Sequence, residues 1–320
     1  MCTEVWREVM AKILIGTCSW TDPTLLASGF YPTSAGTAER RLVYYSQNFN
    51  LVEVDSTYYS MLAERTAKLW CQRTPNNFTF NIKAFALFTQ HPTETRSLPK
   101  DIQSALSEET TKQPRIYYRD VPPKLREELW QRFAQPLLPL DSAGKLGVVL
   151  FQFPQWFYPR HDSREYIIEC QQKLPQYRIA VEFRNAAWLS DNEKDRTLSL
   201  LRENNLAYVS VDEPQGFKSS VPPVAEATSD IAVVRFHGRN KENWEKKGIT
   251  VAERFKYLYS NEELTEWLPR LSHLASQAGQ LHVLFNNCYG DYGVRNARDI
   301  GGLIRSQPLL FPDLAEREEK

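Results

Sequence analysis

Short apolar runs rich in Val, Ile and Phe recur along the chain, each followed by a polar or Gly/Pro break and a longer segment with helical spacing. Several runs, such as VVLF and HVLF, are apolar at successive positions, as strands are when both faces are covered. The pattern therefore predicts buried, parallel strands. We expect eight of them, at residues 13–17, 51–55, 78–83, 146–153, 178–183, 206–211, 231–236 and 281–286.

The alternation is βα throughout, and eight such units predict an α/β fold, a (βα)8 TIM barrel with its active site at the carboxyl ends of the strands. An open doubly wound sheet is the alternative. A GxGxxG turn after the first strand is typical of that fold, but this chain has Gly16-Thr17-Cys18-Ser19-Trp20 there. The predicted helices are 38–48, 64–72, 122–137, 163–173, 193–204, 262–278 and 292–304.

One domain accounts for most of the chain. We assign residues 13–310 to the barrel and residues 84–145 to a helical insertion between the third and fourth strands. A helix in this insertion should start after Asp120, with Pro122 and Pro123 in its first turn. Residues 1–12 are interpreted as an N-terminal extension and residues 311–320 as a C-terminal tail.

Composition narrows the function classes. The 320 residues include 39 Lys+Arg and 39 Asp+Glu, so no global field steers the chain toward nucleic acid or anionic lipid. No apolar run is long enough to span a membrane, and Glu4, Arg7 and Glu8 interrupt any signal-peptide pattern, which predicts a cytoplasmic protein with no membrane partner. The five cysteines are scattered without CxxC spacing, so neither a disulfide scaffold nor structural zinc is indicated.

Polar and charged residues stand at the carboxyl ends of the predicted strands, where a barrel brings them together. A single charge at a strand end is usually solvated or paired, and an ion pair such as Glu53 with Arg235 can serve the architecture alone. Their coincidence over most strands favours a site. These residues are Glu53, Asp55, Lys83, Gln152, Glu182, Arg184, Asp212, Arg235, His237, Asn286 and Asn287.

Four chemistries can be compared with this set. Zinc hydrolysis needs several His or Cys ligands, and only His237 is placed at the rim. A divalent metal would take carboxylate oxygens that Lys83, Arg184 and Arg235 compete to neutralise, so a metal stays open but is not favoured, and no cofactor is evident. A glycosidase needs a fixed spacing of Glu53 and Glu182, which sequence does not give. Schiff-base chemistry would need a desolvated Lys83, although a Lys beside carboxylates is more often a paired cation.

An anionic ligand fits the cations best. Lys83, Arg184, Arg235 and Arg239 are joined by Gly238 and by the segment from Gly290 to Tyr292, in the loops that hold phosphate in many barrels. Such glycines can also simply make turns. Aromatic residues near the rim are interpreted as pocket walls: Trp20, Tyr31, Tyr58, Tyr59, Trp156, Trp188, Trp244 and Tyr292.

Motifs spread over all eight units resemble the domain-of-unknown-function 72 family, also called YecE-like, from about residue 13 to 304. The resemblance implies a TIM barrel and leaves the reaction open, because a fold does not determine chemistry. Asp55, Tyr58 and Gln90 depart from the family pattern. The motifs are Gly16-Thr17-Cys18-Ser19-Trp20, Phe30-Tyr31-Pro32, Val52-Glu53-Val54-Asp55-Ser56-Thr57-Tyr58-Tyr59, Lys83 with Thr89-Gln90-His91, Gln152-Phe153-Pro154, Glu182-Phe183-Arg184 with Trp188, Arg235-Phe236-His237-Gly238-Arg239, and Phe285-Asn286-Asn287 with Asn296-Ala297.

The resulting hypothesis is a hydrolase-type or isomerase/lyase-type enzyme in which Glu53 or Glu182 acts as general acid/base, with Lys83 and His237 as further catalytic residues. Its partner is a small anionic, phosphate-containing or polyhydroxylated molecule. Two alternatives remain: a metal-dependent phosphodiesterase or nuclease that acts on nucleic acid, and a non-catalytic ligand-binding barrel. The predicted substrate-binding residues are Trp20, Asp55, Tyr59, Gln152, Arg184, Trp188, Asp212, Arg235, Gly238, Arg239, Asn286, Asn287, Tyr292 and Asn296.

Overall fold

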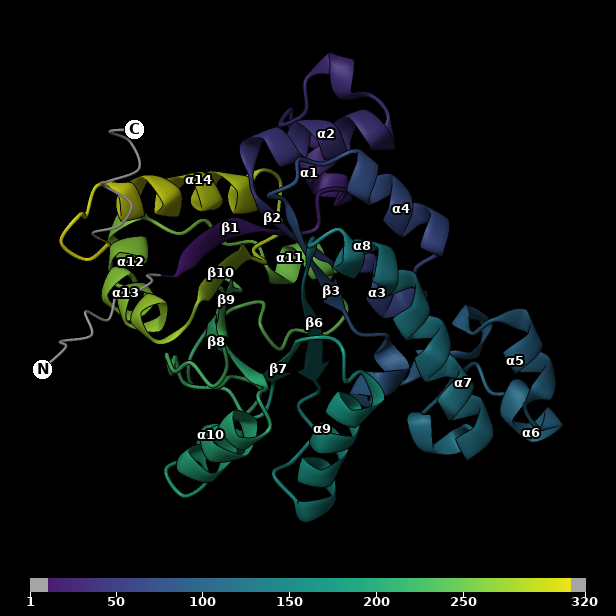
Figure 1. Cartoon of the computed structure of the whole chain (residues 1–320). Helices are drawn as coiled ribbons and strands as arrows, with labels where there is room; N and C mark the ends of the chain where they lie inside the picture. The colour runs from purple at the N-terminus through teal and green to yellow at the C-terminus, as the bar shows by residue number, and fades with distance from the viewer. Residues whose placement is uncertain (1–10, 312–320) are drawn as a thin grey trace, which may run out of the picture.

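Eight parallel strands close into a barrel in the order β1-β10-β9-β8-β7-β6-β3-β2 (Figure 1), in a computed structural model that describes residues 11–311. Each predicted strand coincides with a barrel strand to within one residue at either end, which confirms the (βα)8 TIM barrel. The strands are β1 (Lys12–Cys18), β2 (Leu51–Val54), β3 (Thr79–Lys83), β6 (Leu146–Phe153), β7 (Ile179–Phe183), β8 (Ala207–Asp212), β9 (Ile231–Phe236) and β10 (Gln280–Phe285).

Amphipathic helices surround the barrel and bury their apolar faces against it (Figure 1). In α2, for example, the Thr37 side chain caps the first turn, and Leu42 and Tyr45 are buried. The longer helices are α2 (Ala38–Asn48), α4 (Glu64–Gln72), α7 (Pro123–Ala134), α9 (His161–Lys173), α10 (Lys194–Glu203), α13 (Leu268–Gln277) and α14 (Tyr292–Arg305); the short ones are α1 (Pro23–Ala27), α3 (Ser56–Tyr59), α5 (Lys100–Ala105), α6 (Glu108–Thr111), α8 (Leu138–Ser142), α11 (Val251–Arg254) and α12 (Asn261–Thr265).

Two expectations about helices are corrected. The helix predicted at 262–278 is broken into α12 and α13, because Pro269 near the start of α13 cannot donate to a preceding carbonyl. The predicted βα alternation also fails between β8 and β9, where residues 213–230 form no helix. Pro214, Pro222 and Pro223 remove backbone donors there.

The insertion between β3 and β6 is helical, as predicted, and α7 starts directly after Pro122. It also contains a feature too short for sequence periodicity to show, an antiparallel pair of two-residue strands, β4 (Thr93–Glu94) and β5 (Arg115–Ile116). On α7, Trp130 stacks on Phe88 with ring centroids 3.8 Å apart. The insertion therefore packs onto the same apolar core as the barrel.

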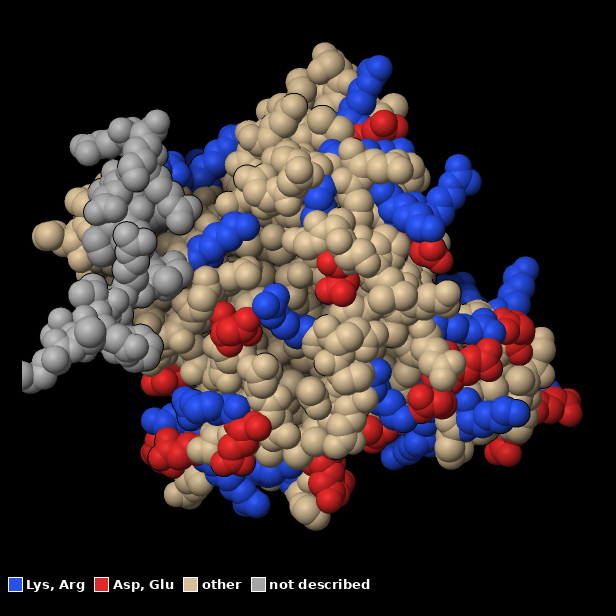
Figure 2. All heavy atoms as spheres, viewed as in Figure 1, with Lys and Arg blue, Asp and Glu red and all other residues tan. Residues whose placement is uncertain are grey.

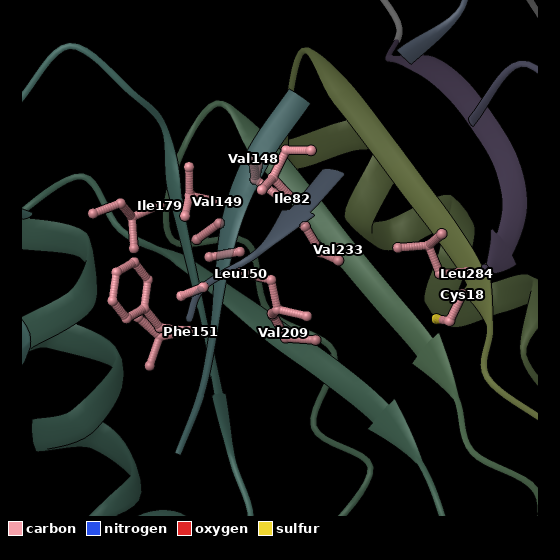
Figure 3. Close-up of a cluster of buried hydrophobic side chains, with 14 of the residues drawn as sticks. Cys18, Ile82, Val148, Val149, Leu150, Phe151, Ile179, Val209, Val233 and Leu284 are labelled. Carbon is pink, nitrogen blue, oxygen red and sulfur yellow. The ribbon is translucent and has the colours of Figure 1, made fainter. Parts of the chain in front are cut away.

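Alternation along the strands divides the core into two layers. Figure 3 shows Leu150, Val209 and Val233 gathered among the strands, whereas Phe151 turns toward the helices, where its ring lies 6.1 Å from that of Trp130. Within residues 11–311, no helix has the length and apolarity needed to cross a membrane. Most of the predicted extension and tail lies outside the described residues.

Candidate active site at the carboxyl end of the barrel

Three charged side chains lie inside the barrel near its carboxyl end. Glu53 of β2, Glu182 of β7 and Arg235 of β9 each have no exposed surface. The Arg235 guanidinium donates to Glu53 Oε1 at 2.5 Å and, through its other terminal nitrogen, to Glu182. One cation thus bridges two carboxylates that come from distant strands, and this bridge is the centre of the candidate site.

Glu182 lies against Arg235, Arg184 and His237. Burial alone would raise its pKa, but the charges of Arg235 and Arg184 outweigh burial and hold the pKa well below its usual range. Arg184 Nε lies 2.8 Å from Glu182 Oε1, and His237 Nε2 lies 3.2 Å from the same oxygen. Glu182 is therefore a fixed negative charge at neutral pH.

His237 is neutral, because burial and the charge of Arg184 lower its pKa to about 3. Asn286 Nδ2 lies 2.9 Å from His237 Nδ1 and donates to it, so the ring proton resides on Nε2 and is donated to Glu182. The two nitrogens thus have distinct roles, and Asn286 sets the tautomer.

Glu213 joins the cluster from the segment after β8, and sequence reasoning did not select it. Its Oε2 accepts from Arg184 at 2.5 Å and its Oε1 from the backbone N–H of Val221 at 2.7 Å. Burial nevertheless raises its pKa to about 8. The cluster is therefore a chain in which carboxyl and guanidinium groups alternate, Glu53–Arg235–Glu182–Arg184–Glu213.

Glu53 differs from Glu182 in one respect that bears on chemistry. Burial raises its pKa to about 7 despite the charge of Arg235. Its Oε1 accepts from Arg235, whereas its Oε2 is buried and has no hydrogen-bond partner among the described residues. Oε2 is therefore the atom that carries the proton near neutral pH.

Lys83 lies at the mouth beside this cluster, with 14% of its side chain exposed. Its direct partner is Asp55, whose Oδ1 lies 3.2 Å from Lys83 Nζ, and the ammonium also sits 5.1 Å from the ring centre of Tyr58. The geometry pairs Lys83 with Asp55, whereas Glu53 pairs with Arg235.

Buried titratable groups make stability depend on pH. Burial lowers the pKa of His91 to about 4 and that of His237 and His282 to about 3, so below about pH 6.5 the unfolded chain binds more protons and acid destabilises the fold. Burial raises the pKa of Glu53 to about 7 and of Glu213 to about 8, so these carboxyls lose folded-state stabilisation as pH rises from about 4.5 to 8.

The melting temperature should therefore be highest near about pH 6.5 and fall on the alkaline side through about pH 8, where only the two glutamates of this group still titrate. Thermal unfolding across this range measures the effect. In Glu213→Gln the alkaline decline should be shallower than in the parent. A melting temperature that rises between about pH 6.5 and 8 would contradict the assignment.

Asp212 and Arg239 lie outside the cluster. Asp212 pairs in register with Phe236, which faces the helices, so its carboxylate points outward and accepts from Tyr259 at 2.7 Å and from Trp267 at 2.6 Å. Arg239 pairs with the same carboxylate at 2.9 Å. This network fastens the end of β8 to the helical layer, and it is the neighbouring Glu213 that joins the cluster, through Arg184.

The glycine N–H groups that we expected to bind phosphate are already used. The Gly238 N–H donates to the Tyr259 hydroxyl at 2.8 Å, and the Gly290 N–H donates to the Thr24 hydroxyl at 2.9 Å. Gly238 has a φ of 87°, and a Cβ there would meet Tyr257 Cβ at 2.6 Å. Both glycines thus serve loop structure in this state.

Four predicted aromatic residues also lie apart from the charges. Trp20 is buried, Trp188 is fully buried and stacked on Phe183 at 4.3 Å, and Tyr59 is 64% exposed. Tyr292 begins α14. They act as packing or surface residues rather than as walls of one pocket.

Asn287 and Asn296 are structural as well. Asn287 donates to Asn296 at 2.9 Å, and Asn296 in turn bonds both backbone groups of Tyr259.

A cleft of about 840 Å³ opens at the carboxyl end, and it is lined by Arg184 of the cluster and by Gln152, which accepts a hydrogen bond from Arg235 at 3.3 Å. Trp156 and Trp244, both expected at the rim, line it too. His91 also lines this cleft. It was not among the predicted site residues, although the Thr89-Gln90-His91 motif contains it. Within residues 11–311, no group of three or more His, Cys, Asp or Glu side chains is arranged to hold a metal.

Comparison with known proteins supports the architecture. A family model described as "Protein of unknown function DUF72" matches residues 14–318. The UPF0759 protein YunF of Bacillus subtilis (strain 168) is 31% identical over 310 residues, covering 96% of this chain and 98% of YunF.

Two solved structures of DUF72 family proteins are also similar. The one from Thermotoga maritima MSB8 is 26% identical with a TM-score of 0.71, covering 91% of this chain and 98% of that chain. One from Enterococcus faecalis V583 is 25% identical with a TM-score of 0.72, covering 93% and 95% respectively.

Proposed function

The chain belongs to the DUF72 family, whose description states no activity, and from this premise we propose that it is an acid–base enzyme acting on an anionic or polyhydroxylated substrate at the carboxyl end of the barrel. The observation that carries the proposal is the state of the Glu53 carboxyl. A buried carboxyl with a pKa of about 7 can both give and take a proton at neutral pH, and its Oε2 is free of partners among the described residues.

Each neighbour of Glu53 has a separate part in this proposal. Arg235 fixes the Glu53 carboxyl through Oε1, so that Oε2 keeps one orientation. Glu182 stays ionised and holds Arg235 in place. Arg184 and Lys83, the cations nearest the mouth, would bind the anionic group of the substrate.

The reaction classes that fit are those that move one proton. Glu53 could protonate a leaving oxygen, as in a hydrolase, or take a proton from carbon beside a carbonyl, as in an isomerase or lyase. Glu182 is the weaker candidate for this role because its low pKa keeps it unprotonated.

A non-catalytic ligand-binding barrel is the second candidate. It is favoured by the pairing of Arg235 with two carboxylates at once, since a saturated buried ion pair can serve only to hold strands together.

Turnover decides between the two candidates. The purified chain would be incubated with sets of sugar phosphates, phosphate esters, polyols and hydroxy acids, and the mixtures analysed by mass spectrometry. We expect conversion of one set at a rate that changes with an apparent pKa near about 7. Tight retention of a compound without conversion in any set would overturn the enzyme and support the binding barrel.

Lys83→Met should weaken binding of an anionic ligand about 30-fold or more and leave the fold intact. Removing one member of a largely buried charged pair costs about 2 kcal/mol or more, and in this proposal the Lys83 ammonium donates to the anionic group of the ligand. Calorimetric titration with inorganic phosphate measures the change. Lys12→Met, at the amino end of β1, is the matched control and should bind like the parent. Equal affinity in the Lys83 variant would remove Lys83 from the site.

A further inference from the structure

Two clefts adjoin at the carboxyl end of the barrel. The cleft of about 840 Å³ that contains Arg184 shares Trp156 with a second cleft of about 580 Å³, which runs between the insertion and the start of α9. His91 lines the first cleft and its neighbour Gln90 the second. Each is the size of a small-molecule site, so together they extend beyond what one small ligand fills. We call the pair the basic groove.

The charge of the basic groove departs from that of the chain. The whole chain has no net charge, and on the face shown in Figure 2 basic and acidic side chains are interspersed. The larger cleft, in contrast, has one acid, Glu245, against five basic residues: Arg184, Lys218, Arg254, Lys246 and Lys247.

Three of those cations are available to a ligand. Lys218, Lys246 and Lys247 are exposed and make no ion pair with another residue of the described range 11–311. Arg254, in contrast, is tied to backbone carbonyls of the 243–246 loop. Unpaired cations along one wall attract a ligand with several negative charges.

Aromatic rings face the same groove. Trp156 and Tyr158 are each 48% exposed and Tyr117 is 36% exposed, which is unusual for rings of this size. Trp156 Nε1 donates to the Gln90 carbonyl at 3.3 Å, which fixes its ring, and Arg160 lies over the ring of Tyr158. Fixed, half-exposed rings beside cations offer stacking surfaces for planar groups.

We propose that the basic groove binds single-stranded nucleic acid, with phosphates on Lys218, Lys246 and Lys247 and bases stacked on Trp156 and Tyr158. The inference rests on the proposed function for one feature: Arg184 joins the groove to the Glu53–Arg235–Glu182 cluster, so one nucleotide unit would present its phosphate or sugar there. The substrate class is then a polyanionic chain whose reacting unit is itself small, anionic and hydroxylated.

Binding of a fluorescein-labelled oligothymidylate of about 15 nucleotides to the full chain tests this inference by anisotropy at several salt concentrations. We expect Trp156→Ala to weaken binding about tenfold. The triple variant Lys218→Ala/Lys246→Ala/Lys247→Ala should lower the slope of log K against log salt by about 2, because each phosphate contact on a single strand contributes about 0.7.

Controls separate the groove from general attraction. The triple variant Lys12→Ala/Lys68→Ala/Lys100→Ala removes as many exposed lysines that do not line the groove and should bind like the parent. Heparin, a polyanion without bases, should bind Trp156→Ala and the parent alike. If both triple lysine variants lose affinity for the oligonucleotide equally, or if the oligonucleotide does not bind, the inference is overturned.

The inference and the proposed function can fail separately. Turnover of a small anionic compound by a chain that does not bind the oligonucleotide would overturn the groove proposal and leave the enzyme standing. Groove-dependent binding without any turnover would support the groove and count against the enzyme. Preference for a duplex over the single strand would contradict the stacking of bases on Trp156.

Discussion

Arg235→Leu is expected to lower the free energy of unfolding by about 3–5 kcal/mol, the cost of leaving buried charges without their partner. Arg235 has no exposed surface and pairs with both Glu53 and Glu182, which are buried as well. Leu fills part of the volume but donates no hydrogen bond. Urea-induced unfolding followed by circular dichroism measures the loss.

Two further variants make this result specific. Arg96→Leu removes an arginine whose side chain is 85% exposed and paired with Glu94, and it should cost less than about 1 kcal/mol. The triple variant Arg235→Leu/Glu53→Gln/Glu182→Gln removes the uncompensated charges and should regain part of the stability. If Arg235→Leu unfolds at the same urea concentration as Arg96→Leu, the buried bridge does not stabilise the fold.

Glu53→Gln is expected to reduce turnover of the substrate found by the screen about 10²–10⁴-fold, the usual contribution of a positioned acid or base. Gln keeps the shape of the protonated carboxyl, so the fold should survive, but its amide neither gives nor takes the proton at the position of Oε2. The rate constants kcat and kcat/KM, measured from about pH 5 to 9, test this. The change of rate that we expect near about pH 7 in the parent should disappear from any residual activity of the variant.

Glu263→Gln is the matched control for this loss. Glu263 is a partly buried carboxylate that pairs with Arg239 in the outward network at 3.3 Å, away from the cluster, so its replacement should leave turnover unchanged. If Glu53→Gln and Glu263→Gln are equally active, Glu53 is not the acid or base.

The candidate site could be located from sequence because charges are anomalous in buried strands. Glu53, Glu182 and Arg235 stood out in runs that were otherwise apolar, and the structure brings these three into direct contact. The eight strands were likewise visible from apolar runs alone. The break between α12 and α13 could have been predicted from Pro269, which has no backbone N–H. It was missed because the apolar residues keep helical spacing on both sides of the break.

Other features depend on geometry that one sequence does not contain. Asp212 and Glu213 are adjacent acids, and only the register with β9 decides that Asp212 faces the helices. The Gly238 N–H is taken by a hydroxyl 21 residues away, a long-range contact that no local motif reveals. Lys218, Lys246 and Lys247 lie in two loops that approach each other only after the barrel closes.

The chain of alternating carboxyl and guanidinium groups from Glu53 to Glu213 implies reciprocal linkage between ligand and proton. An anion bound beside Arg184 adds negative charge near Glu213 and Glu182, and this charge would raise the pKa of the glutamates that already titrate near neutrality. Binding would then take up protons, and by thermodynamic reciprocity protons would tighten binding. The same ion pairs that hold the strands together would thus make the protein's affinity respond to the acidity of its surroundings.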